Sequence, residues 1–177
     1  NVSRPKSLPS KKEAPNLIIV EPHMNLYIKR SMQIVDIFKK YVADEDLHVY
    51  SIDESILDVT DSYKLFGKDP FEVARKIQLD VHEQLGLYTT VGIGENPVLA
   101  KFALDLDAKK RKSMIAFWHY LEVPDTLWKV QNLTDIWGIS KRTEVRLNKL
   151  GITNVYELAH TSPKKLKKEF GVVGEQL

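Results

Sequence analysis

Two neighbouring carboxylates, Asp53 and Glu54, are the residues of this sequence best suited to chemistry. They lie within YSIDESILDVT, residues 50–60, and β-branched and aromatic residues flank them on both sides. This pattern predicts a strand, a tight corner and a second strand. Adjacent carboxylates on a stiff corner can bind a hard divalent cation such as Mg²⁺ when phosphates supply further oxygens. The alternative is a pair of solvated acids at an ordinary turn.

A second segment, TTVGIGENPVLAKFALD at residues 89–105, has the residue types of a phosphate site. We predict a strand, a Gly-Ile-Gly turn, and a helix with Asn96 as its cap and Pro97 in its first turn. Free N–H groups at that helix end favour an anion, and Lys101 is one turn further along, within reach of a phosphate. The alternative is a surface lysine on an ordinary connection. The segment is not a Walker A loop, because the Gly-Lys-Ser/Thr ending is absent.

A third segment, LTDIWGISKRTEVRLNKLGITNVYELA at residues 133–159, predicts two helices that meet at a tight turn. The turn is Trp137-Gly138-Ile139-Ser140, and its glycine lets backbone N–H groups approach a DNA phosphate. The second helix is expected to face inward with Val145, Leu147 and Leu150, and outward with Lys141, Arg142, Arg146 and Lys149. The alternative is an ordinary helical hairpin, and we expect Trp137 in the core under either interpretation.

Composition limits the class of protein. The chain has 177 residues, enough for one large or two small domains, and it has no cysteine, which excludes disulfides and thiolate metal sites. The net charge is +2, but residues 138–177 contain eight Lys or Arg and four Glu, which indicates a polyanion partner or a solvated lysine-rich face. No apolar run is long enough to span a bilayer and no signal peptide is visible, so we expect a cytoplasmic protein without a membrane partner.

The order of predicted elements indicates an α+β fold. After an irregular arm at residues 1–15, we expect strands at 17–20, 88–93 and 114–118 (an edge strand), and the hairpin around Asp53. Helices are expected at 25–42 with Asn25 as cap, at 70–85 with Gly86 as stop, and at 96–109. The central part matches a split β-α-β-β-α-β arrangement, an antiparallel sheet with helices on one face. From residue 132 onward only short helices are expected.

Together and in this order, the three motifs resemble the Y-family translesion DNA polymerases, closest to the bacterial UmuC branch. The resemblance covers the chain from Leu17 onward. It implies a ferredoxin-like palm at residues 16–118, a connection at 119–131 and a helix-hairpin-helix thumb at 132–177, with 1–15 as the end of the fingers. It also implies a fragment that lacks the N-terminal catalytic strand, most of the fingers and the little finger.

The resemblance implies error-prone, template-directed DNA synthesis across lesions, as in the SOS response, by two-metal nucleotidyl transfer. Asp53 and Glu54 would bind Mg²⁺, Glu54 facing the primer hydroxyl, while Lys101 steadies the nucleoside triphosphate beside Ser51. The thumb would hold the backbone of primer-template DNA through Gly138, Ile139, Ser140, Lys141, Arg142 and Arg146. Ser140 stands where the family more often has a second glycine, which weakens the approach to phosphate. A sliding clamp is an expected partner of the full-length protein, and the fragment alone is expected to be inactive.

Two other functions remain open at this point. One is a catalytically inactive module that binds duplex DNA through its thumb-like half. The other is a nucleotidyl cyclase, because such enzymes also use carboxylates on a ferredoxin-like sheet, although the basic helical tail counts against it. A purely structural domain would require all three motifs to arise by chance.

Overall fold

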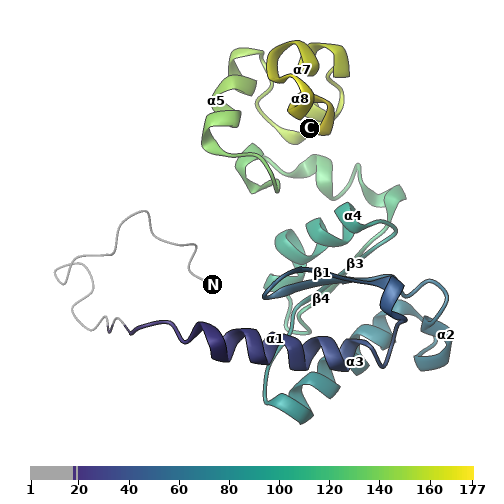
Figure 1. Cartoon of the computed structure of the whole chain (residues 1–177). Coiled ribbons are helices and arrows are strands. Elements are labelled where there is room, and N and C mark those ends of the chain that lie inside the picture. The colour runs from purple at the N-terminus through teal and green to yellow at the C-terminus, as the bar shows by residue number, and fades with distance from the viewer. Residues whose placement is uncertain (1–17, 19) are drawn as a thin grey trace.

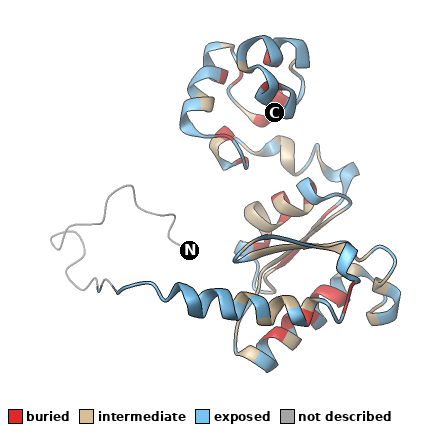
Figure 2. Ribbon diagram, viewed as in Figure 1, coloured by how far each residue is buried: buried red, intermediate tan, exposed pale blue. Residues whose placement is uncertain are grey.

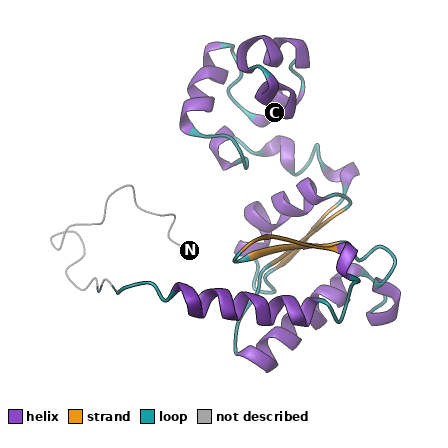
Figure 3. Ribbon diagram, in the orientation of Figure 1, coloured by secondary structure: helices purple, strands orange, loops and turns teal. Residues whose placement is uncertain are grey.

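The structure is a computed structural model that describes residue 18 and residues 20–177 (Figure 1). Strands and helices are combined in the first two thirds of the described chain, and helices alone follow (Figure 3). The protein therefore has a mixed α/β fold. The predicted arm at 1–15 lies outside the described residues. Of the predicted strand at 17–20, Ile18 and Val20 are in no strand, and the other two residues are outside the description.

Local signals determine where the two long helices begin and end. Helix α3, Pro70–Leu85, begins where the Asp69 side chain accepts a hydrogen bond from the Glu72 N–H, and it ends at Gly86 with φ 68°. The predicted helix at 70–85 and its glycine stop are thus confirmed. Helix α1, Met24–Phe38, follows His23, which makes no capping side-chain bond. The prediction of Asn25 as the cap is wrong, because that residue already lies inside the first turn.

Helices α1 and α3 pack against each other and enclose the first of two apolar cores. Its buried members come from one stripe of each helix and from the turn after α1: Ile37, Tyr41, Val73, Ile77 and Val81. Figure 2 shows red, buried stretches along α3, whereas α1 is mostly exposed or half-buried. The short helix α2, Tyr63–Phe66, places the Phe66 ring 4.9 Å from the Tyr41 ring at the edge of this core. Leu57, at the end of the first hairpin, also packs against this core.

The predicted hairpin is confirmed. After the 3₁₀ turn η1, Asp44–Asp46, strand β1, Leu47–Ser51, pairs antiparallel with β2, Glu54–Leu57. Ile52 and Asp53 form the two-residue turn, and neither has positive φ, so the turn is not of the primed type that best matches strand twist. The ladder shifts register between Val49 and Ser51, and such an irregularity increases local twist.

The remaining strands differ from prediction. Strand β3, Val91–Gly94, pairs in parallel with β4, Ile115–Trp118, so the described strands form two two-stranded sheets, one antiparallel and one parallel. The single antiparallel sheet expected from the sequence is therefore not what these strands form. The reason is the helical crossover between β3 and β4, which returns the chain to the same end of the sheet and makes parallel pairing possible. Gln78 of α3 ties this sheet to the first core by donating to the Thr89 carbonyl at 2.8 Å.

The crossover is helical throughout but changes its winding. Helix α4, Pro97–Phe102, continues into a π-helical segment η2, Ala103–Asp107, and then into the 3₁₀ turn η3, Ala108–Lys110. The predicted cap is confirmed, because the Asn96 side chain accepts from the Leu99 N–H at 2.8 Å. Gly92 of β3 allows close packing: a Cβ there would lie 2.1 Å from the Ala100 carbonyl oxygen and 2.4 Å from the Leu104 nitrogen.

The second core extends beyond the β-containing part into the C-terminal helices. It includes Leu99 and Trp118 as well as Leu133, Leu147 and Leu166. The elements after β4 are η4 Tyr120–Glu122, η5 Leu127–Lys129, η6 Leu133–Asp135, α5 Lys141–Lys149, α6 Val155–Ala159, α7 Pro163–Phe170 and α8 Val172–Gln176. Residues 119–177 are all described and contain no strand, as predicted. Within the described residues, no helix combines the length and apolar character needed to cross a membrane.

Candidate active site

Glu54 and Lys101, which are 47 positions apart in the sequence, meet between β2 and α4. The Lys101 ammonium lies 2.7 Å from each carboxylate oxygen of Glu54. The two side chains are only 23% and 17% exposed, so this ion pair is partly shielded from water. The structure thus brings together one residue of the predicted carboxylate pair and the predicted phosphate-binding lysine.

Asp105 is a second carboxylate at the same ammonium. Its Oδ2 lies 3.1 Å from the Lys101 Nζ, and its Oδ1 lies 2.5 Å from the Nζ of Lys109. Burial lowers the pKa of Lys101, but the hydrogen bonds to Glu54 and Asp105 outweigh it, so the pKa is raised above its ordinary value. Burial likewise acts to raise the pKa of Asp105, but the bonds from Lys109 and Lys101 bring it below the usual range. Both groups are therefore charged at neutral pH.

Asp53 lies at the exposed tip of the hairpin, and its described partner is Ser51. The Ser51 hydroxyl donates to the Asp53 Oδ1 at 2.9 Å. This bond holds one oxygen of the carboxylate, and the residue as a whole is exposed. Ser51 is thus next to the predicted site and orients one of its acids.

The donor chemistry of Asp53 and Glu54 fits a hard divalent cation, but only in part. Carboxylate oxygens are ligands that Mg²⁺ prefers, and it also retains water and phosphate oxygens. Among the described residues, no group of three or more His, Cys, Asp or Glu is arranged to hold a metal ion. Metal binding by Asp53 and Glu54 therefore stays a prediction, and these two carboxylates would be only part of a set of ligands.

The predicted DNA-binding turn is present at residues 137–140. Gly138 has φ 89°, and a Cβ there would meet no atom within 4 Å, so its backbone is open to an approaching group. Ser140 caps α5 by accepting from the Thr143 N–H at 3.3 Å. Lys141 and Arg142 are exposed in the first turn of that helix. Ile139 differs from the others because it is only 5% exposed and its N–H donates to the Ile136 carbonyl at 3.0 Å.

Trp137 is not in the core, so this prediction is wrong. The indole is 53% exposed. It packs edge-on against Tyr50 of β1, with the ring centroids 5.9 Å apart. An aromatic partner on the hairpin, rather than the helical core, explains its position. This contact joins the turn at 137–140 to β1, the strand that ends at Ser51 just before the Asp53 turn.

One prediction for α5 and one for the segment before it need correction. Val145 was expected to face inward but is 54% exposed, whereas Leu147 is fully buried. Arg146 faces outward, but its guanidinium is bound to Glu169 of α7 at 2.9 Å and lies 4.3 Å from the centre of the Phe170 ring. Arg146 therefore links α5 to α7. The helix expected before the turn is only the 3₁₀ turn η6.

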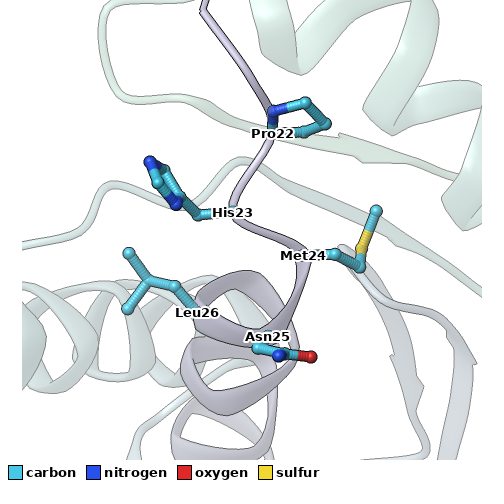
Figure 4. A pocket seen from close by; sticks show the side chains of 5 residues that line it. All are labelled: Pro22, His23, Met24, Asn25 and Leu26. Atoms are coloured by element: carbon cyan, nitrogen blue, oxygen red, sulfur yellow. The ribbon is translucent and has the colours of Figure 1, made fainter.

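A shallow hollow lies at the start of α1, away from these residues. Pro22, His23, Met24, Asn25 and Leu26 line it (Figure 4). None of the predicted site residues lines it, and its own residues offer one imidazole and one amide as polar side chains. The candidate site is therefore the cluster around Glu54 and Lys101, with the turn at 137–140 as a second element.

Comparison with known proteins assigns the class. Residues 4–105 match the family described as impB/mucB/samB. The chain is 46% identical over 166 residues to a Bacillus subtilis (strain 168) protein named "Putative UV-damage repair protein UvrX", and 35% identical over 168 residues to "DNA polymerase IV 2" of the same organism. It also resembles the solved insertion ternary complex of Dbh DNA polymerase, with TM-score 0.79 and 29% identity over 94% of this chain and 46% of that one. The chain belongs to the impB/mucB/samB family, the Y-family of DNA polymerases.

The match to UvrX includes 93% of this chain but only 38% of UvrX. The match to DNA polymerase IV 2 includes 95% of this chain and 40% of that protein. The resemblance to the Y-family noted from the sequence is confirmed.

Sequence reasoning missed two residues of the site region, Asp105 and Tyr50. The spacing of Asp105, four positions from both Lys101 and Lys109, was a usable signal. Tyr50 offered no local signal, because its partner Trp137 is far away in the sequence.

Proposed function

We propose that this chain is part of a template-directed, error-prone DNA polymerase that copies damaged DNA. In this proposal residues 16–118 act as the palm and residues 132–177 as a helix-hairpin-helix thumb. The single observation that carries the proposal is the meeting of Glu54 and Lys101 at 2.7 Å. It places a carboxylate suited to a metal next to an ammonium suited to a phosphate, within a chain of Y-family membership.

Each residue of the cluster has a proposed task. Asp53 and Glu54 would hold Mg²⁺, which when bound supplies charge stabilisation for phosphoryl transfer. Ser51 keeps the Asp53 carboxylate in one orientation through its hydroxyl bond. Lys101 binds phosphate oxygens of the incoming nucleotide, and its raised pKa keeps it charged for that purpose. The low exposure of the pair limits its contact with water and strengthens these electrostatic contacts.

The C-terminal helices would hold DNA without reading its sequence. Gly138 offers open backbone, while Lys141 and Arg142 add positive charge at the same turn. Contacts of this kind go to phosphates and position the duplex, but carry no base information. Such binding suits a polymerase that must accept damaged templates.

The decisive experiment is primer extension by the full-length protein to which we assign this chain. Glu54→Gln keeps the size of the side chain but removes its charge, and we expect extension to fall by a factor of about 100 or more, as when charge stabilisation of a transition state is lost. Gel-shift binding of primer-template DNA should stay within about twofold, because phosphate contacts made elsewhere supply the affinity. Unchanged extension would refute the assignment. Retained DNA binding with no synthesis in the unaltered protein would instead support an inactive binding module.

DNA binding can be assigned to the turn with a matched charge reversal. The double variant Lys141→Glu/Arg142→Glu should weaken all duplex sequences alike and make the slope of log affinity against log salt shallower by about 2, since each phosphate contact contributes about 0.9. Lys149→Glu, at the other end of the same helix, is the control and should have a small effect. Equal effects of both changes would argue against a phosphate contact at the turn.

A further inference from the structure

Two half-exposed aromatic side chains from distant parts of the chain lie against each other beside the turn at 137–140. Trp137 is 53% exposed and Tyr50 is 47% exposed, although their ring centroids are only 5.9 Å apart. The ring planes meet at 74°, an edge-to-face arrangement that stabilises aromatic pairs. Each ring therefore holds the other in place and still keeps much of its own surface open.

The support of this aromatic pair is rigid. Ile136 and Ile139, which flank Trp137 and Gly138 in the chain, are both buried in the second core. Because these flanking residues are buried, the turn is fixed and Trp137 is directed toward solvent. Tyr50 is on β1, which is paired with β2. The two rings thus form a preorganised surface, which loses little conformational entropy when a partner covers it.

The pair lies between a basic and an acidic part of the surface. Lys141 and Arg142 are exposed shortly after Trp137 in the chain, and Asp53 is exposed shortly after Tyr50. Phosphates are attracted to the basic residues and repelled by the acidic tip of the hairpin. Between the two, a neutral aromatic surface suits the uncharged parts of a nucleic acid, which are the sugars and the edges of the bases.

We propose that Tyr50 and Trp137 form a contact surface for duplex DNA, on which sugars and base edges pack while the turn at 138–142 binds the phosphates. The surface is continuous with that turn, because Trp137 directly precedes Gly138, whose backbone is open. The inference rests on the proposed function, since it takes duplex DNA as the partner of the turn. It requires neither a bound metal nor an active polymerase.

An aromatic contact and a phosphate contact respond differently to salt. Each phosphate neutralised by Lys or Arg adds about 0.9 to the slope of log affinity against log salt, because counterions are released. Packing of a ring against sugars and bases removes apolar surface from water and releases no condensed counterion. Loss of the aromatic surface should therefore weaken binding alike at low and high salt, whereas Lys141→Glu/Arg142→Glu should change the slope.

The first measurement is fluorescence anisotropy of a labelled duplex bound by the 177-residue chain, in a salt series that starts at low salt. Trp137→Ala should weaken binding by about tenfold, which corresponds to about 1.4 kcal/mol, with the slope unchanged within about 0.5. Trp137→Phe should recover most of the loss, because an aromatic ring is restored. Tyr156→Ala is the matched control and should leave the affinity unchanged, since Tyr156 is 52% exposed but packs with Trp128 and His160.

A second measurement separates contact with DNA from support of the turn. Trp128→Phe leaves Trp137 as the exposed tryptophan of the chain beside the buried Trp118. Saturating duplex should then protect the tryptophan emission from quenching by acrylamide. Unchanged quenching overturns the proposal even where Trp137→Ala weakens binding, because a ring that only supports the turn stays open to solvent. A changed salt slope in Trp137→Ala also overturns it.

The remaining outcomes separate this inference from the proposed function. Duplex binding that Trp137→Ala leaves unchanged refutes the aromatic contact surface alone. If the unaltered chain binds no duplex, the DNA-binding part of the proposed function fails, and the contact surface fails with it. If the full-length protein makes no DNA while both measurements give the expected results, the proposed polymerase fails and the contact surface for DNA stands.

Discussion

Gly92→Ala should be among the most damaging small substitutions in this protein. The added Cβ would lie 2.1 Å from the Ala100 carbonyl oxygen, 2.4 Å from the Leu104 nitrogen and 2.7 Å from the Leu104 Cβ. Two of these neighbours are backbone atoms of the crossover helix, which cannot move aside as a flexible side chain can. Overpacking costs about 1–3 kcal/mol in well-packed sites. Because backbone atoms lie on two sides, we expect Gly92→Ala to lower the free energy of unfolding by about 3 kcal/mol or more.

The measurement is thermal unfolding followed by circular dichroism, with urea unfolding as a second method. In a domain of this size, 1 kcal/mol shifts Tm by about 2–4 °C, so Gly92→Ala should lower Tm by about 6–12 °C. Gly86→Ala is the matched control, because its Cβ would meet nothing within 4 Å and only the positive φ of 68° is unfavourable. That variant should lose about 1 kcal/mol. If the two variants lose the same stability, the close approach of β3 and the crossover is not as described.

Three other outcomes are expected. Tyr41 donates a hydrogen bond to Asp80, and burial raises the pKa of Tyr41 to about 12. The stability that Tyr41 contributes is therefore present below pH 10 and is lost as the pH rises toward 12. Tyr41→Phe should remove about 2 kcal/mol of this pH dependence from a curve of unfolding free energy against pH. A double-mutant cycle with Tyr50→Ala and Trp137→Ala should give a coupling of about 1 kcal/mol in urea unfolding, whereas additive losses would contradict the ring contact. Arg146→Gln should lower stability by about 1 kcal/mol but change DNA affinity less than Lys141→Gln does in the same gel-shift assay.

The parts of the fold that could be predicted from the sequence are those set by local chemistry. Helix α3 is an example, since its apolar stripe, the early Pro70 and the final Gly86 all act within a few residues of where they stand. The hairpin at Asp53 is another, because alternating strand residues flank a short turn. In both cases no distant partner is needed to determine the element.

Several of the predictions that failed depended on contacts between distant residues. Trp137 was assigned to the core because large apolar rings are usually buried, yet Tyr50 offers it a partner at the surface. The parallel pairing of β3 with β4 depends on how the crossover packs, which no short window of sequence determines. At the candidate site, Glu54 and Lys101 were each identified by residue type, but their direct ion pair is a product of tertiary structure.

The apolar core shared by the crossover and the C-terminal helices has a practical consequence for dividing this protein. Leu99 and Trp118 lie in one buried cluster with Leu133 and Leu147. A chain cut at residue 131, between the predicted palm and thumb, would expose half of that cluster to water on each piece. Both fragments should aggregate or be degraded by proteases. A recombinant fragment should therefore keep both halves of this core in one chain.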